Sequence, residues 1–231
     1  TNDPYDFYGR ASKTNILNYK DEAFDNLSQL QVITYQKYDK FGNAESQVID
    51  SYSSAAPDAA KLIDHKVIAN VYTSDVARRR GNAGVTTVQR YASLEETSAN
   101  LIEKTKTTTD LFDDRGNALK QTSETYVLDA ANTLKLQKVT TIENMDINTH
   151  GDAAVQHITT SETTSPGADT LTTVSYQVIT NRRFDPSHNV ENQMVYTYAS
   201  EGGVLLDVQE IRSEGFHSSG TSLKQTIVTY A

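Results

Sequence analysis

One pattern returns seven times along this chain, and it limits what the chain can fold into more than any other feature. In its full form an aromatic residue and an aspartate are followed by two free residues, Gly-Asn and a small residue. The clearest copies are residues 38–44 and 112–118, and the first begins at Tyr5. Successive glycine positions are 33, 39, 35, 35, 37 and 32 residues apart. A period of this size is typical of repeat proteins, in which each unit packs mainly on its neighbours.

The pattern predicts a tight turn. Aspartate at the first position of a type I turn, with a left-handed glycine at the fourth, closes a β-hairpin through a bulge. We place the seven turns near residues 6–10, 39–43, 75–82, 113–117, 146–152, 185–189 and 217–221 of one array over residues 1–231. Their expected structural residues are Asp6, Gly9, Asp39, Gly42, Asn43, Gly81, Asn82, Asp113, Gly116, Asn117, Gly151, Asp185, Asn189 and Gly220. The Gly81 and Gly151 copies lack the nearby aspartate, which predicts two longer loops.

A tyrosine follows ten residues after the glycine position in six of the seven copies. This tyrosine ladder consists of Tyr19, Tyr52, Tyr91, Tyr126, Tyr198 and Tyr230. The segments between are rich in Thr, Val, Ile and Tyr, which suit a pleated, half-exposed surface. The aromatic residue before each turn is expected to face the small residue after it across the hairpin, as Tyr38 would face Ala44. The ladder is best explained by strand register, with a glycan or apolar ligand as the alternative.

The fold class that follows is all-β, an array of about seven β-hairpin repeats with about thirteen strands. We expect an elongated curved antiparallel sheet or a β-solenoid-like stack, because neither face of the strands is continuously apolar. The hydrophobic share of 37% suits such an array, which needs only a thin layer between neighbours. The sole helix candidate is the short segment 94–102.

The pattern at residues 38–43 and 112–117 resembles the YD repeats of the RHS/YD-repeat family of bacterial surface proteins and their animal relatives. In that family the hairpins wind into an extracellular shell, often around a toxin. The resemblance therefore implies a hairpin architecture and an exported bacterial setting, with an extracellular or cell-surface location. The repeat here is longer than the usual YD unit, and no core-closing or toxin segment is recognisable. A shell segment of a toxin-delivery protein is accordingly kept as an alternative function.

A search for chemistry yields no catalytic, cofactor or metal site. The five histidines have no metal-ligand spacing, and His188 and His217 fall on turns, where a solvated loop residue is expected. Asp113, Asp114 and Asn117 could hold Ca²⁺, but capping of the turn explains them better. The basic run 78–80 is expected at a solvated loop tip. A net charge of −9 argues against nucleic-acid binding, and no apolar run reaches the roughly 20 residues of a membrane-spanning helix.

These observations predict a non-enzymatic structural module that acts as a scaffold, stalk or self-assembling filament subunit through edge-strand pairing. The first copy has almost no strand before its turn, so we expect the vacant edge to be filled by self-association or by flanking repeats of a longer chain. Thr1 would then be a processed N-terminus. A surface adhesin or carbohydrate-binding module that uses the tyrosine ladder or the turn loops is the alternative. No cofactor is expected.

Overall fold

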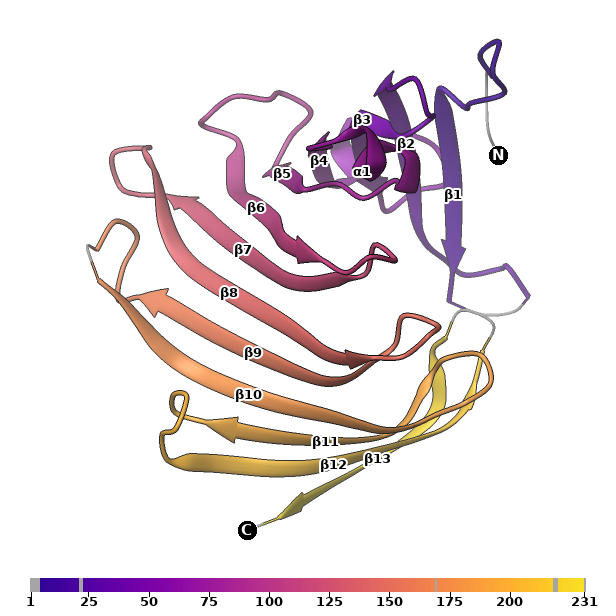
Figure 1. The fold of residues 1–231 in the computed structure, drawn as a ribbon. Helices are drawn as coiled ribbons and strands as arrows, with labels where there is room; N and C mark the ends of the chain where they lie inside the picture. The colour runs from indigo at the N-terminus through magenta and orange to yellow at the C-terminus, as the bar shows by residue number, and fades with distance from the viewer. Residues whose placement is uncertain (1–4, 21–22, 169, 218–219, 231) are drawn as a thin grey trace. The chain divides into compact units, whose positions relative to one another are not determined.

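The computed structural model describes residues 5–20, 23–168, 170–217 and 220–230. Its strands are antiparallel and pair in chain order from β1 to β13 within one sheet (Figure 1). The strands are β1 Lys13–Tyr19, β2 Leu27–Tyr38, β3 Ala44–Tyr52, β4 Leu62–Val71, β5 Val85–Tyr91, β6 Leu101–Phe112, β7 Ala118–Leu128, β8 Leu134–Ile147, β9 Ala153–Thr163, β10 Leu171–Phe184, β11 Val190–Tyr198, β12 Leu205–Phe216 and β13 Ser222–Tyr230. The prediction of an all-β array of antiparallel hairpins is confirmed.

The chain divides into two compact units. The first comprises Thr1–Thr108 with Thr125–Leu136, and the second comprises Thr109–Glu124 with Gln137–Ala231. In the first unit the buried side chains of Leu30, Val32 and Tyr52 form an apolar cluster against which Leu62 packs. In the second unit the buried side chains of Tyr176 and Met194 lie on β10 and β11, and the polar Glu210 and Ser213 are buried on β12. Both units therefore bury only a thin layer, as an array of hairpins requires.

Two short helices interrupt the strands of the described part of the chain. The 3-10 helix η1, Ala59–Lys61, precedes β4, and the helix α1, Asp75–Arg80, follows β4. Ser74 caps α1 by accepting from the Ala77 amide, and Gly81 ends it with φ +72°. The helix predicted from sequence at 94–102 is wrong. Instead, α1 lies in the loop predicted at 75–82, because Ser74 caps the start of this helix and Gly81 caps its end. Among the described residues no helix is long and apolar enough to cross a membrane.

The hairpin register follows the aromatic residue before each turn. Tyr5 pairs with Ala11, Tyr38 with Ala44, and Phe184 with Val190. The register shifts just before the turn, between Tyr35 and Lys37 and again between Asn181 and Arg183, so the incoming strand carries a bulge there. A bulge twists a hairpin locally and fixes the direction in which the turn side chains project.

Asparagine side chains join each of several hairpins to the preceding one. Asn181 on β10 donates from Nδ2 to the Ala153 carbonyl on β9 at 2.8 Å, and its Oδ1 accepts from Gln193 Nε2 on β11 at 2.9 Å. Asn144 makes the same two bonds with the Ala118 carbonyl and Gln156, at 2.9 and 2.7 Å. In the first unit Asn70 donates to the Ala44 carbonyl and accepts from Thr86. We call this arrangement the asparagine relay. Each relay asparagine lies four residues before the first residue of the turn that follows it or, for Asn70, before the helix cap Ser74.

Candidate functional site

The recurring motif folds into five-residue turns, and the candidate site is built from two of them. In each turn the amide of the fourth residue donates to the carbonyl of the first, and the amide of the first donates to the carbonyl of the fifth. For Asp39, Gly42 and Asn43 these bonds are 3.2 and 2.9 Å long. The same pair of bonds closes turns 6–10, 113–117, 148–152, 185–189 and 217–221, and also 129–133 between β7 and β8. This geometry is that of a type I turn followed by a left-handed residue.

The first residue of a regular turn is an aspartate that serves the turn itself. Asp113 Oδ1 accepts from the amides of Arg115 and Asn117 at 2.9 and 2.8 Å, and its Oδ2 accepts from Asn117 Nδ2 at 2.9 Å. Hydrogen bonding from the Asn117 side chain, followed by these backbone amides, holds the pKa of Asp113 below its usual value despite partial burial. Both carboxylate oxygens of Asp113 thus cap the turn.

The fifth residue reaches the next turn. A Cβ placed on Gly81 would lie 3.3 Å from Asn43 Oδ1, and one on Gly151 would lie 3.0 Å from Asn117 Oδ1. Gly220 has the same relation to Asn189 at 3.1 Å. Each of these three glycines is therefore fixed twice, by its positive φ and by the amide oxygen of the preceding turn.

The turn between β8 and β9 departs from this scheme. Its first residue is Asn148 and its fifth is Asp152, the reverse of the usual order. Asn148 Oδ1 still accepts from the amides of His150 and Asp152, at 2.8 and 3.0 Å, and Nδ2 donates to Asp152 Oδ2 at 2.9 Å. The loop predicted at 146–152 is therefore not longer than the others, because Asn148 substitutes for the missing aspartate.

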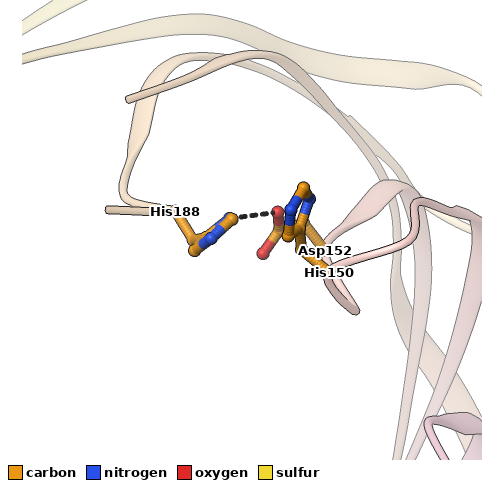
Figure 2. Close-up of side chains that lie close together, drawn as sticks. All are labelled: His150, Asp152 and His188. Atoms are coloured by element: carbon orange, nitrogen blue, oxygen red, sulfur yellow. Dashed lines mark hydrogen bonds and ion pairs between the residues drawn. The ribbon is translucent and has the colours of Figure 1, made fainter. Parts of the chain in front are cut away.

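The turn between β10 and β11 departs at the facing position. His188 stands where five other turns have glycine and turn 129–133 has Asn132, and it keeps the left-handed conformation with φ +67°. Its Nδ1 lies 2.9 Å from Asp152 Oδ2, and its ring centroid lies 4.5 Å from that of His150 (Figure 2). One ligand atom from each of His150, Asp152 and His188 can be chosen so that all lie within 4.8 Å of one another. We call these three residues the His-Asp-His cluster.

The electrostatics of the cluster centre on its carboxylate. The pKa of Asp152 is lowered, first by the hydrogen bond from the Asn148 amide, against a rise from partial burial, and then by the interaction with His188. The two histidines are exposed and Asp152 is half-buried. The cluster is therefore an anionic oxygen flanked by two imidazoles at a surface open to solvent.

Sequence analysis expected no metal-ligating group here and treated His188 as a solvated turn residue. A search by spacing misses the cluster because His188 lies 36 residues after Asp152 and reaches it only through the stacking of successive turns. Aligning the repeats would have given a signal. The aligned turns show Asn148 and Asp152 exchanged, and His188 in place of glycine. Asp152 and His188 fall at positions that face each other in adjacent turns.

The tyrosine ladder lies within the strands of the sheet, and the basic run 78–80 lies at the end of α1. Tyr19, Tyr52, Tyr91, Tyr198 and Tyr230 are the last residues of β1, β3, β5, β11 and β13, and Tyr126 lies within β7. Tyr52 and Tyr91 are buried, and burial is the main cause that raises the pKa of each. Of the basic run, Arg78 lies in the last turn of α1, and its Nη1 donates to Glu45 Oε1 at 2.8 Å.

Two further titratable groups are buried in the sheet. In the first unit His65 places Nδ1 at 2.5 Å from Asp50 Oδ1 and Nε2 at 3.6 Å from Glu96 Oε1. In the second unit Glu210 accepts from Arg212, Asn192 and Tyr230, and these bonds, that of Arg212 foremost, lower its pKa to about 2. Each of these two groups is buried beside charged or polar partners, whereas the two histidines of the His-Asp-His cluster are exposed.

Comparison with known proteins finds no family model and no curated protein that matches the chain. The resemblance to YD repeats accordingly stays a prediction, carried by the turn motif alone.

Proposed function

We propose that the chain is a non-enzymatic structural repeat module, a scaffold, stalk or filament subunit of an exported bacterial protein that extends by pairing of edge strands. The observation that carries this proposal is the asparagine relay. Asn70, Asn144 and Asn181 repeat one set of contacts between successive hairpins. A contact that recurs from hairpin to hairpin can be repeated again by another hairpin of the same kind, which is how repeat arrays grow.

The free edge of β13 in the described sheet supports growth at this strand. Among the described residues β13 pairs only with β12, so the backbone groups along its other edge have no strand partner. Its apolar side chains Leu223 and Ile227 are 65% and 55% exposed, whereas Val195, at the position of Ile227 in β11, is half-buried. Unpaired edges with exposed apolar residues are templates for another strand.

We assign the partner of β13 as β1 of a second copy of the chain. β1 is the other terminal strand in the order, and it exposes Ile16 and Leu17. Pairing of two different edges is heterologous, so each added copy presents a new free edge and the product is a fibre. The extracellular setting is the part of the proposal that rests on the YD resemblance.

The test is size measurement at rising protein concentration, by light scattering after gel filtration and by negative-stain microscopy. We expect head-to-tail oligomers whose length increases with concentration. Ile227→Lys should abolish them, since a charge on an edge strand blocks pairing. Val204→Lys is the matched control, because Val204 is 73% exposed in the β11–β12 loop. Dispersed monomers at high concentration, or equal effects of the two variants, would contradict the assembly.

A second function, glycan binding, is favoured by one specific feature of the first unit. A hollow of about 500 Å³ opens between turns 6–10 and 39–43, with Tyr8, Tyr38 and Phe41 among its lining residues. The Arg10 guanidinium lies 4.9 Å from the ring centroids of both Tyr8 and Tyr38. Aromatic faces with a few fixed polar groups are typical of small-ligand sites. A glycan-array signal removed by Tyr8→Ala, with folding unchanged, would favour an adhesin over a scaffold.

A further inference from the structure

We propose that His150, Asp152 and His188 bind a divalent transition-metal ion of the Zn²⁺ class, which clips the turn between β8 and β9 to the turn between β10 and β11. The proposal is independent of self-assembly, since all three ligands belong to one unit of one chain. It would add a cross-link between neighbouring hairpins at the edge of the sheet where the turns project.

The chemistry of the donor set selects the metal. Two imidazole nitrogens and one carboxylate oxygen suit Zn²⁺, Co²⁺, Ni²⁺ or Cu²⁺, whereas Ca²⁺ and Mg²⁺ prefer sites made of oxygen. Three protein ligands leave at least one coordination position for water, as in open zinc sites. The chain has no cysteine, so no thiolate competes for the ion.

The geometry is close to what an ion needs. Ligand atoms about 2.0–2.1 Å from a tetrahedral Zn²⁺ lie roughly 3.4 Å from one another. His188 Nδ1 and Asp152 Oδ2 are already 2.9 Å apart, and the whole set falls within 4.8 Å. Small rotations of the two exposed histidine side chains therefore complete the site without moving the backbone. The ion would take the place of the hydrogen bond between Nδ1 and Oδ2, because Nδ1 presents its lone pair to the metal.

The side chain of Asn148 holds the Asp152 carboxylate in place. Asn148 Nδ2 donates to Asp152 Oδ2 at 2.9 Å. The Asn148 side chain is itself held in place, because its Oδ1 accepts from two backbone amides of the same turn. Outer partners of this kind orient a metal ligand and are part of its affinity. The exchange of Asn148 and Asp152 in this turn thus places a carboxylate beside His188 of the next turn, and it keeps a side-chain amide that positions this carboxylate.

A hydrogen bond between His188 and Asp152 alone would not account for the whole arrangement. It leaves His150 unexplained, although the His150 ring lies 4.5 Å from that of His188 and the two are tilted by 37°. It also leaves unexplained why a histidine occupies a left-handed position that is glycine in turns 6–10, 39–43, 113–117, 148–152 and 217–221. Strain at such a residue is characteristic of functional sites.

The experiment is a titration of the untagged, metal-stripped protein with Co²⁺, followed by visible absorption, and with Zn²⁺, followed by calorimetry. We expect one saturable site per chain. His188→Gly should weaken it at least about tenfold, since even loss of an outer partner costs about 10–100-fold. This variant restores the glycine found at the same position of five other turns, so it should fold at least as well as the parent. His150→Ala should weaken the site by a similar factor.

His217→Ala is the matched control, because His217 is an exposed histidine of another turn, outside the cluster. It should leave the affinity for both ions unchanged. In addition, Zn²⁺ should raise the melting temperature of the parent and of His217→Ala, but not that of His188→Gly. Absence of a saturable site, or equal affinity in the parent, His188→Gly and His150→Ala, would overturn the proposal. So would a loss of binding confined to His217→Ala.

Discussion

Two kinds of contact between successive turns can be compared. At three junctions an asparagine oxygen faces a glycine: Asn43 with Gly81, Asn117 with Gly151, and Asn189 with Gly220. At the junction of turns 148–152 and 185–189 a carboxylate, Asp152, faces the imidazole of His188. The first kind leaves no room for a side chain at the glycine. The second kind fills the same place with two charged or chargeable groups and adds His150 beside them.

The sheet directly below the altered junction is regular. Asn181 still donates to the Ala153 carbonyl and accepts from Gln193, at distances within 0.2 Å of those around Asn144. The relay and the backbone bonds of the turns thus hold the hairpins together, and they do not depend on which side chains occupy the fourth and fifth turn positions. A rigid scaffold that leaves its loop side chains free to vary is where functional sites commonly arise.

The largest effect should come from forcing a side chain into a regular junction. Gly151 has φ +99°, and a Cβ there would lie 3.0 Å from Asn117 Oδ1, so Gly151→Val should destabilise the second unit by about 2–3 kcal/mol. Gly42 separates the two causes. It has φ +91°, but its Cβ would meet only Arg10 Cδ at 3.8 Å, so Gly42→Val should cost about 1–2 kcal/mol. Chemical denaturation measures both, and an equal or smaller loss for Gly151→Val would show that the asparagine contact does not matter.

The next effect concerns the relay below the junction. Asn181→Ala removes two hydrogen bonds and leaves the Ala153 carbonyl and the Gln193 amide without that partner, at a cost of about 1–3 kcal/mol. Gln225→Ala is the control at the exposed edge strand, where one bond of 3.4 Å to Ser213 is lost and less than about 0.5 kcal/mol is expected. Urea unfolding of the two variants compares them directly. If both cost the same, the relay does not hold hairpins together.

The local part of this architecture could be predicted from the sequence because it rests on short-range chemistry. The turn motif and the segments rich in Thr, Val, Ile and Tyr lead to the all-β hairpin array, and the turn type leads to pairs such as Tyr38 with Ala44. The relay was missed because half of it is invisible in the sequence: the acceptors of Asn144 and Asn181 are backbone carbonyls 26 and 28 residues away. The helix α1 was missed although Ser74 and Gly81 mark its ends, because six residues give too short a periodic pattern.

The candidate site could be predicted even less. In the sequence its residues stand out only as departures from the repeat. Whether they lie close together depends on which turn lies against which in the fold. That relation follows from the order of strands in the sheet, which spacing along the chain does not reveal. A histidine on a hairpin turn is by itself a solvated loop residue, and only the facing Asp152 gives it a partner.

The smallest effect, and the one that separates the two kinds of junction most directly, is a gain in stability. In the metal-free protein His188→Gly removes a left-handed side chain and loses one exposed hydrogen bond to Asp152. We expect the variant to be more stable by up to about 1 kcal/mol, since relief of the positive φ exceeds the value of an exposed polar contact. His188→Ala loses the same bond but keeps the strain, so it should be less stable than the parent. If thermal melts rank His188→Gly below His188→Ala, the histidine conformation is not strained, and the junction of Asp152 with His188 differs from the three asparagine–glycine junctions only in its side chains.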